Sequence, residues 1–165
     1  MSTEVWQRGS IPGYEPLLMP VVHSFLQVKE DVAGLVAHLD EELLWREPAG
    51  AASIGFHIRH IGGSTERLLT YARGERLSAE QLAAAKAEST ERPLRDALVA
   101  EVQAALDRAL TQVRSTSADS LLLERTVGRA GLPSTTLGLL FHAAEHATRH
   151  AGQAITTARI LVGGR

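Results

Sequence analysis

The chain has 165 residues, with 17 Lys and Arg against 19 Asp and Glu, seven His and no Cys. The lack of cysteine excludes disulfides, thiolate zinc sites and a cysteine nucleophile, and a formal net charge of −2 argues against a general nucleic-acid binder. No apolar run approaches the roughly 18 residues of a membrane span and no secretory signal is visible, so we expect a cytoplasmic protein with one domain over residues 1–165.

The first predicted elements in chain order are a lead-in and a long helix. Residues 1–15 contain Gly and Pro at several positions and are expected to be irregular. A helix is predicted to begin near Pro16 or Pro20, because proline is tolerated in the first helical turn. Apolar residues then recur at mostly three- and four-residue spacing as far as Leu39, which is typical of a helix with one face toward a core.

A second helix is predicted from Ser53, a good N-cap, to about Ala72, after a connection over residues 40–52. Gly62 and Gly63 lie in its middle and cost about 1–2 kcal/mol of helix propensity. Two glycines there indicate either the close approach of another element or a local irregularity.

The second half of the chain predicts three more helices. Residues 78–88 form a short, solvated crossover helix, and residues 93–114 form a long one. Residues 115–134 read as a linking segment, whose run of three leucines at 121–123 is expected to lie against the rest of the protein. The last helix begins after Ser134 or Thr135 and continues to about Val162. Four long helices predict an all-α fold, an antiparallel four-helix bundle.

Three histidines recur every four residues on the last predicted helix. His142, His146 and His150 lie at i, i+4 and i+8, and each step rotates the side chain by only about 40°, so they share one face. Neutral imidazole is the commonest protein metal ligand, and two at i, i+4 spacing can bind one ion. The alternative is a set of histidines with ordinary hydrogen-bond partners, and the spacing alone leaves it open.

A second histidine pair lies on the second predicted helix. His57 and His60 are three residues apart, about 60° around the axis, so both can face a neighbouring helix. Three histidine ligands drawn from two helices would leave a fourth position for water or substrate, as in catalytic zinc sites. The two clusters together predict a metal site.

Two other metalloprotein patterns fit poorly. His142, Glu145 and His146 match H-x-x-E-H, but the proteases with that motif are far larger chains. Di-iron bundles need Glu-x-x-His on two helices, and no Glu in this chain has a His three residues later.

Three segments, taken in order, carry a family resemblance: residues 43–48 (LLWREP), 53–61 (SIGFHIRHI) and 146–153 (HATRHAGQ). The last is similar to the H-x-x-x-H-x-G-Q signature of the DinB/YfiT-like family of metalloenzymes, and the resemblance extends over roughly residues 21–162. Two positions depart from the family pattern: Ala52, where Trp is frequent, and Ala151, where Arg is frequent. Neither departure removes a ligand.

The resemblance implies a four-helix bundle with a long crossover connection and a divalent ion, zinc or nickel, held by His60, His146 and His150. It also implies a homodimer and a small-molecule substrate. The implied activity is that of a metal-dependent hydrolase or of a transferase that uses a low-molecular-weight thiol. Around the ligands we expect His142, His57 and Gln153 as neighbouring or pocket residues, and no catalytic residue is assigned.

Two further expectations concern the role of Glu145 and the alternative function. Glu145 is expected to form a structural ion pair rather than to orient a ligand, because adjacent helical positions point about 100° apart. The alternative function is a non-catalytic, dimeric bundle that binds a metal or a small molecule as a sensor or stress-response module.

Overall fold

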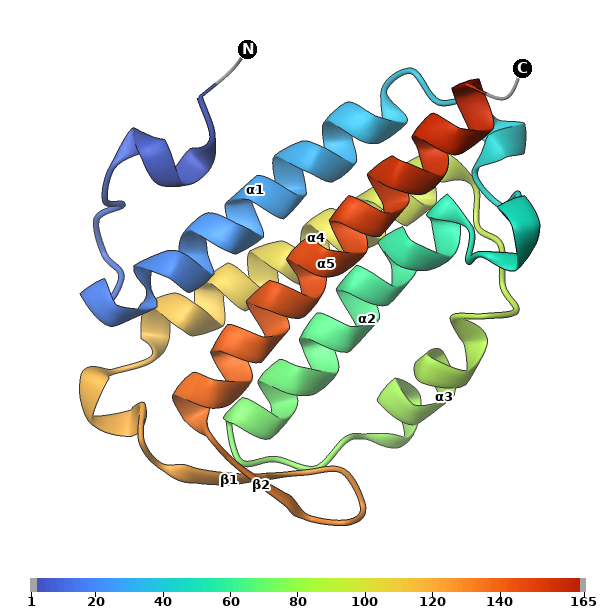
Figure 1. Ribbon diagram of the computed structural model, residues 1–165. Coiled ribbons are helices and arrows are strands. Elements are labelled where there is room, and N and C mark those ends of the chain that lie inside the picture. The colour runs from blue at the N-terminus through green and yellow to red at the C-terminus, as the bar shows by residue number, and fades with distance from the viewer. Residues whose placement is uncertain (1–2, 164–165) are drawn as a thin grey trace.

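Four long helices form a bundle in the computed structural model, which describes residues 3–163 (Figure 1). The four helices form a ring in which α1 packs against α4 and α5, and α2 also packs against α4 and α5. The first and last helices run in one direction and the two middle ones in the other (Figure 1). The predicted four-helix bundle is thereby confirmed, and its helices are α1 (Met19–Val36), α2 (Ile54–Ala72), α4 (Arg95–Ser115) and α5 (Thr136–Gly163).

The helix ends agree with the cap residues in the sequence. Ser53 Oγ accepts a hydrogen bond from the Phe56 N–H at 3.1 Å and so caps α2. Thr135 Oγ1 accepts one from the Gly138 N–H at 3.0 Å at the start of α5. Gly74, just after α2, has a φ of 81°, the left-handed conformation that glycine adopts most readily.

The lead-in is more ordered than the prediction of an irregular segment. It contains two short 3-10 helices, Val5–Arg8 and Pro16–Leu18. Val5 is buried, and its N–H donates to Gln27 Oε1 of α1 at 2.9 Å. The lead-in is therefore held to α1 by a hydrogen bond and an apolar contact that helix periodicity does not reveal.

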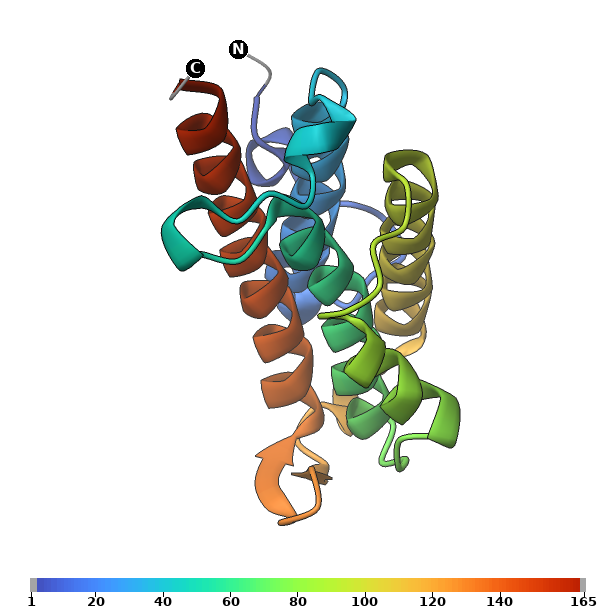
Figure 2. The same ribbon diagram turned by 90° about the vertical axis from the view of Figure 1, so that its right-hand side faces the viewer.

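A short helix, α3 (Ala79–Ala87), lies within the crossover between α2 and α4. The crossover is long because α2 and α4 run in the same direction, so the chain returns the length of the bundle between them (Figure 2). A capping box between Ser78 and Gln81 begins α3, and no residue of α3 is buried. This confirms the predicted solvated crossover helix.

A β-hairpin before α5 was not predicted. Strands β1 (Glu124–Val127) and β2 (Leu132–Thr135) pair antiparallel in the segment expected to be a link. Each strand has four residues, too few to display a period of two, and the second contains Pro133. The leucine run was predicted only in part, because Leu121 is buried while Leu122 is 76% exposed and Leu123 is exposed too.

The core lies between the four long helices, and α2 packs against both α4 and α5. Phe25, Ile58 and Leu106 are fully buried on three different helices. Within residues 3–163, no helix has both the length and the apolar character that crossing a membrane requires.

Candidate metal site

Histidines from α2 and α5 meet where these two helices pack against each other. His60 projects from α2, and His146 and His150 project from α5 one turn apart. One ring nitrogen of each lies within 4.8 Å of the other two. The fold thus brings together the three residues that the sequence predicted as ligands, and this group could hold a metal ion.

The spacing of the three rings suits a shared ion. His60 Nε2 lies 3.0 Å from His146 Nε2, close to the separation of about 3.3 Å expected for two nitrogens bound tetrahedrally to one zinc. The centroid of the His150 ring lies 4.6 Å from that of His60 and 4.5 Å from that of His146. Phe56 stacks on His60 with an interplanar angle of 10° and covers one face of that imidazole.

Glu88 holds the other nitrogen of His60. His60 Nδ1–H donates to Glu88 Oε2 at 2.7 Å, and Glu88 also accepts hydrogen bonds from Arg67 of α2. A carboxylate on Nδ1 fixes the proton there and leaves the Nε2 lone pair directed at the histidine group, the arrangement typical of metal-binding histidines. Burial alone would raise the pKa of Glu88, but the hydrogen bonds from His60 and Arg67 outweigh it and hold the pKa below its usual value.

Glu88 is a site residue that helical spacing in the sequence does not indicate. Glu88 follows α3, 28 residues beyond His60, so no helical spacing links the two. The available signal was the glycine pair in α2, because Gly63 is the position at which Glu88 approaches the helix. The expectation that another element comes close at these glycines is confirmed.

His57 contacts the histidine group from the side. His57 Nδ1 lies 3.0 Å from His150 Nδ1, and the His57 residue is only 6% exposed. Burial, with the neighbouring His60, lowers the pKa of His57. It is outside the set of three ring nitrogens that gather within 4.8 Å.

Two of the ligand candidates, His146 and His150, are held in the state that binds metal. Burial, reinforced by His60, lowers the pKa of His146, and the same causes together with His146 and His57 lower the pKa of His150 to about 4. Both rings are therefore neutral at pH 7. Because a ligating histidine must be neutral, no proton has to be displaced before an ion binds.

The hydrogen-bond pattern also fits a cation between the rings. With the proton of His60 on Nδ1, its Nε2 carries a lone pair toward His146 Nε2. His146 Nδ1 is buried and has no hydrogen-bond partner among the described residues. A cation would accept the lone pairs of both Nε2 atoms, so the residues present fit the metal that three clustered imidazoles imply.

The remaining predicted neighbours lie on the exposed face of α5. The ring of His142 is 5.6 Å from that of His146, and its Nδ1 lies 3.3 Å from Glu145 Oε1. Glu145 accepts from Arg149 at 2.6 Å, which is the ion pair expected for it. Gln153 is exposed. His142 is therefore next to the histidine group without joining it.

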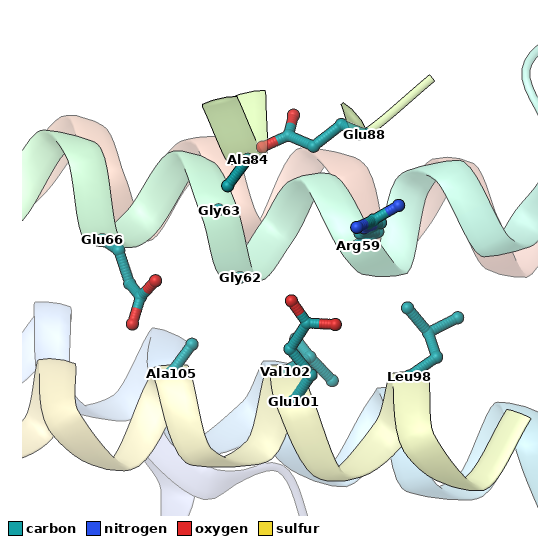
Figure 3. Close-up of a pocket in the computed structure, with 10 residues that line it drawn as sticks. All are labelled: Arg59, Gly62, Gly63, Glu66, Ala84, Glu88, Leu98, Glu101, Val102 and Ala105. Atoms are coloured by element: carbon teal, nitrogen blue, oxygen red, sulfur yellow. The ribbon is translucent and has the colours of Figure 1, made fainter. Parts of the chain in front are cut away.

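A small pocket of about 50 Å³ lies on the other side of α2, toward α4. Figure 3 shows Glu66 and Glu101 directed into the space between these helices, whereas Glu88 approaches α2 from the crossover beside Gly63. None of the three clustered histidines lines this pocket, although Glu88, the hydrogen-bond partner of His60, does. The pocket is therefore separate from the histidine group.

A family model described as the DinB superfamily matches residues 24–154, most of the chain and a span that includes all three clustered histidines. No curated protein matches the chain.

Proposed function

The chain belongs to the DinB superfamily, and from this premise we propose that it is a metal-dependent enzyme whose divalent ion is bound by His60, His146 and His150. The observation that carries the proposal is the approach of the three ring nitrogens to within 4.8 Å of one another. The ion we favour is zinc or nickel, which the family resemblance implies and which three imidazoles can bind.

The reaction class rests on the number of protein ligands together with the family resemblance. Three ligands leave a coordination position open, and an ion held this way lowers the pKa of a water or thiol that occupies it. We therefore propose a hydrolase or a low-molecular-weight-thiol transferase acting on a small molecule. Because the chain has no cysteine, a sulfur nucleophile would have to come from a separate thiol.

The residues of this chain have distinct parts in the proposal. Glu88 keeps the proton of His60 on Nδ1, and His57 contacts Nδ1 of His150. His142 is half exposed one turn from His146, a position from which it can exchange protons with solvent. Gln153 lies one further turn along α5 from the ligands. A homodimer is part of the proposal through the family resemblance, while the cytoplasmic location and the single domain stay predictions.

Metal analysis tests the site directly. Protein purified without a histidine tag, loaded with zinc or nickel and desalted, is expected to retain close to one ion per chain by inductively coupled plasma mass spectrometry. His60→Ala and His146→Ala are expected to lose it, and His38→Ala, which changes an exposed histidine outside the group, is the matched control. Unchanged metal content in both ligand variants would show that the site is wrong.

A second candidate function is a non-catalytic bundle that binds a metal or a small molecule. The observation in its favour is the histidine group itself, because such a group can bind a metal ion without catalysing a reaction. A screen of ester hydrolysis and of thiol transfer to a generic electrophile separates the two. Turnover that depends on the metal and disappears in His146→Ala supports the enzyme, whereas metal binding without turnover on either substrate class supports the second candidate.

A further inference from the structure

We propose that Glu88 is a positioning residue for the metal site, delivered by the crossover helix α3 and admitted to α2 by Gly63. This inference rests on the proposed function, because it assigns to a carboxylate outside the histidine group the task of orienting one of the ligands.

The contacts of Glu88 leave its carboxylate little freedom. Oε2 accepts from His60 Nδ1 at 2.7 Å, Arg67 donates to both carboxylate oxygens, and the Glu88 side chain is 8% exposed. A buried carboxylate with a cation on one side and an imidazole N–H on the other has one stable orientation. That orientation directs Nε2 of His60 at His146.

Gly63 makes the approach possible. A Cβ at this position would overlap Glu88 Oε1 and would lie 2.9 Å from Arg67 Nη1. At the adjacent Gly62, a Cβ would meet only ordinary contacts, 3.5 Å from Ala105 Cβ and from Val102 Cα of α4. The two glycines therefore have different roles, and only Gly63 leaves room for the Glu88 carboxylate.

The crossover docks on α2 mainly through polar groups at this same end. No residue of α3 is buried, whereas Glu88 directly after it is. Arg59 of α2 donates to the backbone carbonyls of Ala87 at 3.0 Å and of Glu91 at 3.1 Å, two bonds that do not involve the Glu91 carboxylate. Arg59 and Arg67 thus hold the end of α3 from both sides of Glu88, so that the crossover places the carboxylate on His60.

The test measures the zinc affinity of the full-length, tag-free chain by competition with a chromophoric chelator. Glu88→Gln is expected to weaken zinc binding by about 10–100-fold, the usual effect of losing a hydrogen-bond partner of a ligand. Glu91→Gln is the matched control, because Glu91 belongs to the same segment but pairs with Arg59 and has a 64% exposed side chain. It is expected to change the affinity less than about fivefold.

A pair of glycine variants repeats the test with the carboxylate still present. Gly63→Ala displaces the flexible ends of two side chains, Glu88 and Arg67, and no backbone atom, so the protein is expected to fold and to lose zinc affinity as Glu88→Gln does. Gly62→Ala is expected to keep wild-type affinity. In the metal-free protein, the His60 Nδ1 proton should have a strongly downfield chemical shift in a nitrogen-15-edited proton NMR spectrum. This proton shift should move upfield in Glu88→Gln and in Gly63→Ala.

The outcomes separate this inference from the proposed function. If the wild type binds zinc and Glu88→Gln binds it as tightly as Glu91→Gln does, the positioning role is overturned and the three-histidine site stands. If the wild type binds neither zinc nor nickel, the proposed function fails and the positioning role fails with it. A Glu88→Gln chain that does not fold leaves the decision to Gly63→Ala and its NMR signal.

Discussion

Residues 3–163 contain two histidine–carboxylate pairs, one at the end of α3 and one on the outer face of α5. His60 Nδ1 donates to Glu88 at 2.7 Å, and the Glu88 side chain is buried against Arg67. His142 Nδ1 lies 3.3 Å from Glu145, and both side chains are substantially exposed. The pairs have the same chemical groups, but only the first is desolvated, and a hydrogen bond to a charged group gains strength where water is excluded.

The two pairs also differ in whether the contact is local or long-range along the chain. Glu145 reaches His142 within one turn of a single helix, a contact that any helix with this sequence would allow. Glu88 reaches His60 only because the crossover returns along α2. We therefore expect changes at the α3 end to affect metal binding and folding strongly, and changes on the outer face of α5 to affect them weakly.

The largest expected effect comes from the histidines of the two pairs. His60→Ala should weaken zinc binding beyond the roughly 100-fold upper range for loss of a supporting hydrogen bond, because a ligand itself is removed. His142→Ala should change it less than about fivefold, because exposed pairs contribute little. Isothermal titration of both variants checks this, and a strong loss in His142→Ala would mean that the outer pair belongs to the site.

The next largest difference is expected in the stability that each carboxylate gains from its arginine, Arg67 beside Glu88 and Arg149 beside Glu145. Arg67→Ala leaves a buried carboxylate without its cation and should lower the free energy of unfolding by about 3 kcal/mol. Arg149→Ala breaks an exposed i, i+4 pair with Glu145 and should cost about 0.5 kcal/mol or less. Urea unfolding of the metal-free proteins gives both values, and equal losses would remove the distinction between the two regions.

Acid should destabilise the metal-free protein through the inner histidines. His150 has a pKa of about 4 in the folded chain, set by burial and by His60, His146, His57 and Arg149, against an ordinary value of about 6.5. Between these values the unfolded chain binds more protons, so stability falls as the pH falls from about 6.5 toward 4. Unfolding measured with a chelator present should show this slope, and His150→Gln should flatten it.

The smallest effect tests how α3 is held in place. Ser78→Ala removes the side chain that caps α3 and should cost about 1 kcal/mol at most of local stability. Hydrogen exchange should become faster in α3 while it stays unchanged in α5. Zinc affinity should fall less than in Glu88→Gln, since Arg59 and Arg67 still hold the end of the crossover; an equal fall would assign the positioning to the whole helix.

Much of the fold was predictable because its signals are local. Ser53 and Thr135 cap their helices as their side chains suggest, and the apolar spacing of α1 matches its buried face. The hairpin was missed because four-residue strands carry almost no periodic signal. The exposure of Leu122 was missed because a run of identical residues does not reveal which of them turns inward.

The three histidines were predicted as a group, since their spacing on two helices is itself geometric information. Residues at i, i+4 and i+8 share a face in any helix, which grouped His142, His146 and His150, and the family resemblance implied that His146 and His150 are the ligands among them. That His60 rather than His57 would join them was implied by the family resemblance, and helical geometry alone could not choose between residues three positions apart. In the structure, a ring nitrogen of His60 gathers with those of His146 and His150, and His57 lies beside His150.

By itself, the sequence determined the helices, their faces and the two histidine clusters, because these depend on the regular rotation of a helix and on side chains near its ends. Only the tertiary structure decided which carboxylate reaches the site. Glu145 is three residues from His142, and Glu88 is 28 residues from His60, but the path of the crossover and the missing side chain of Gly63 bring Glu88 to the inner ring. Hydrogen bonding depends on distance in space, and in a bundle with a long crossover that distance is set by how the helices pack.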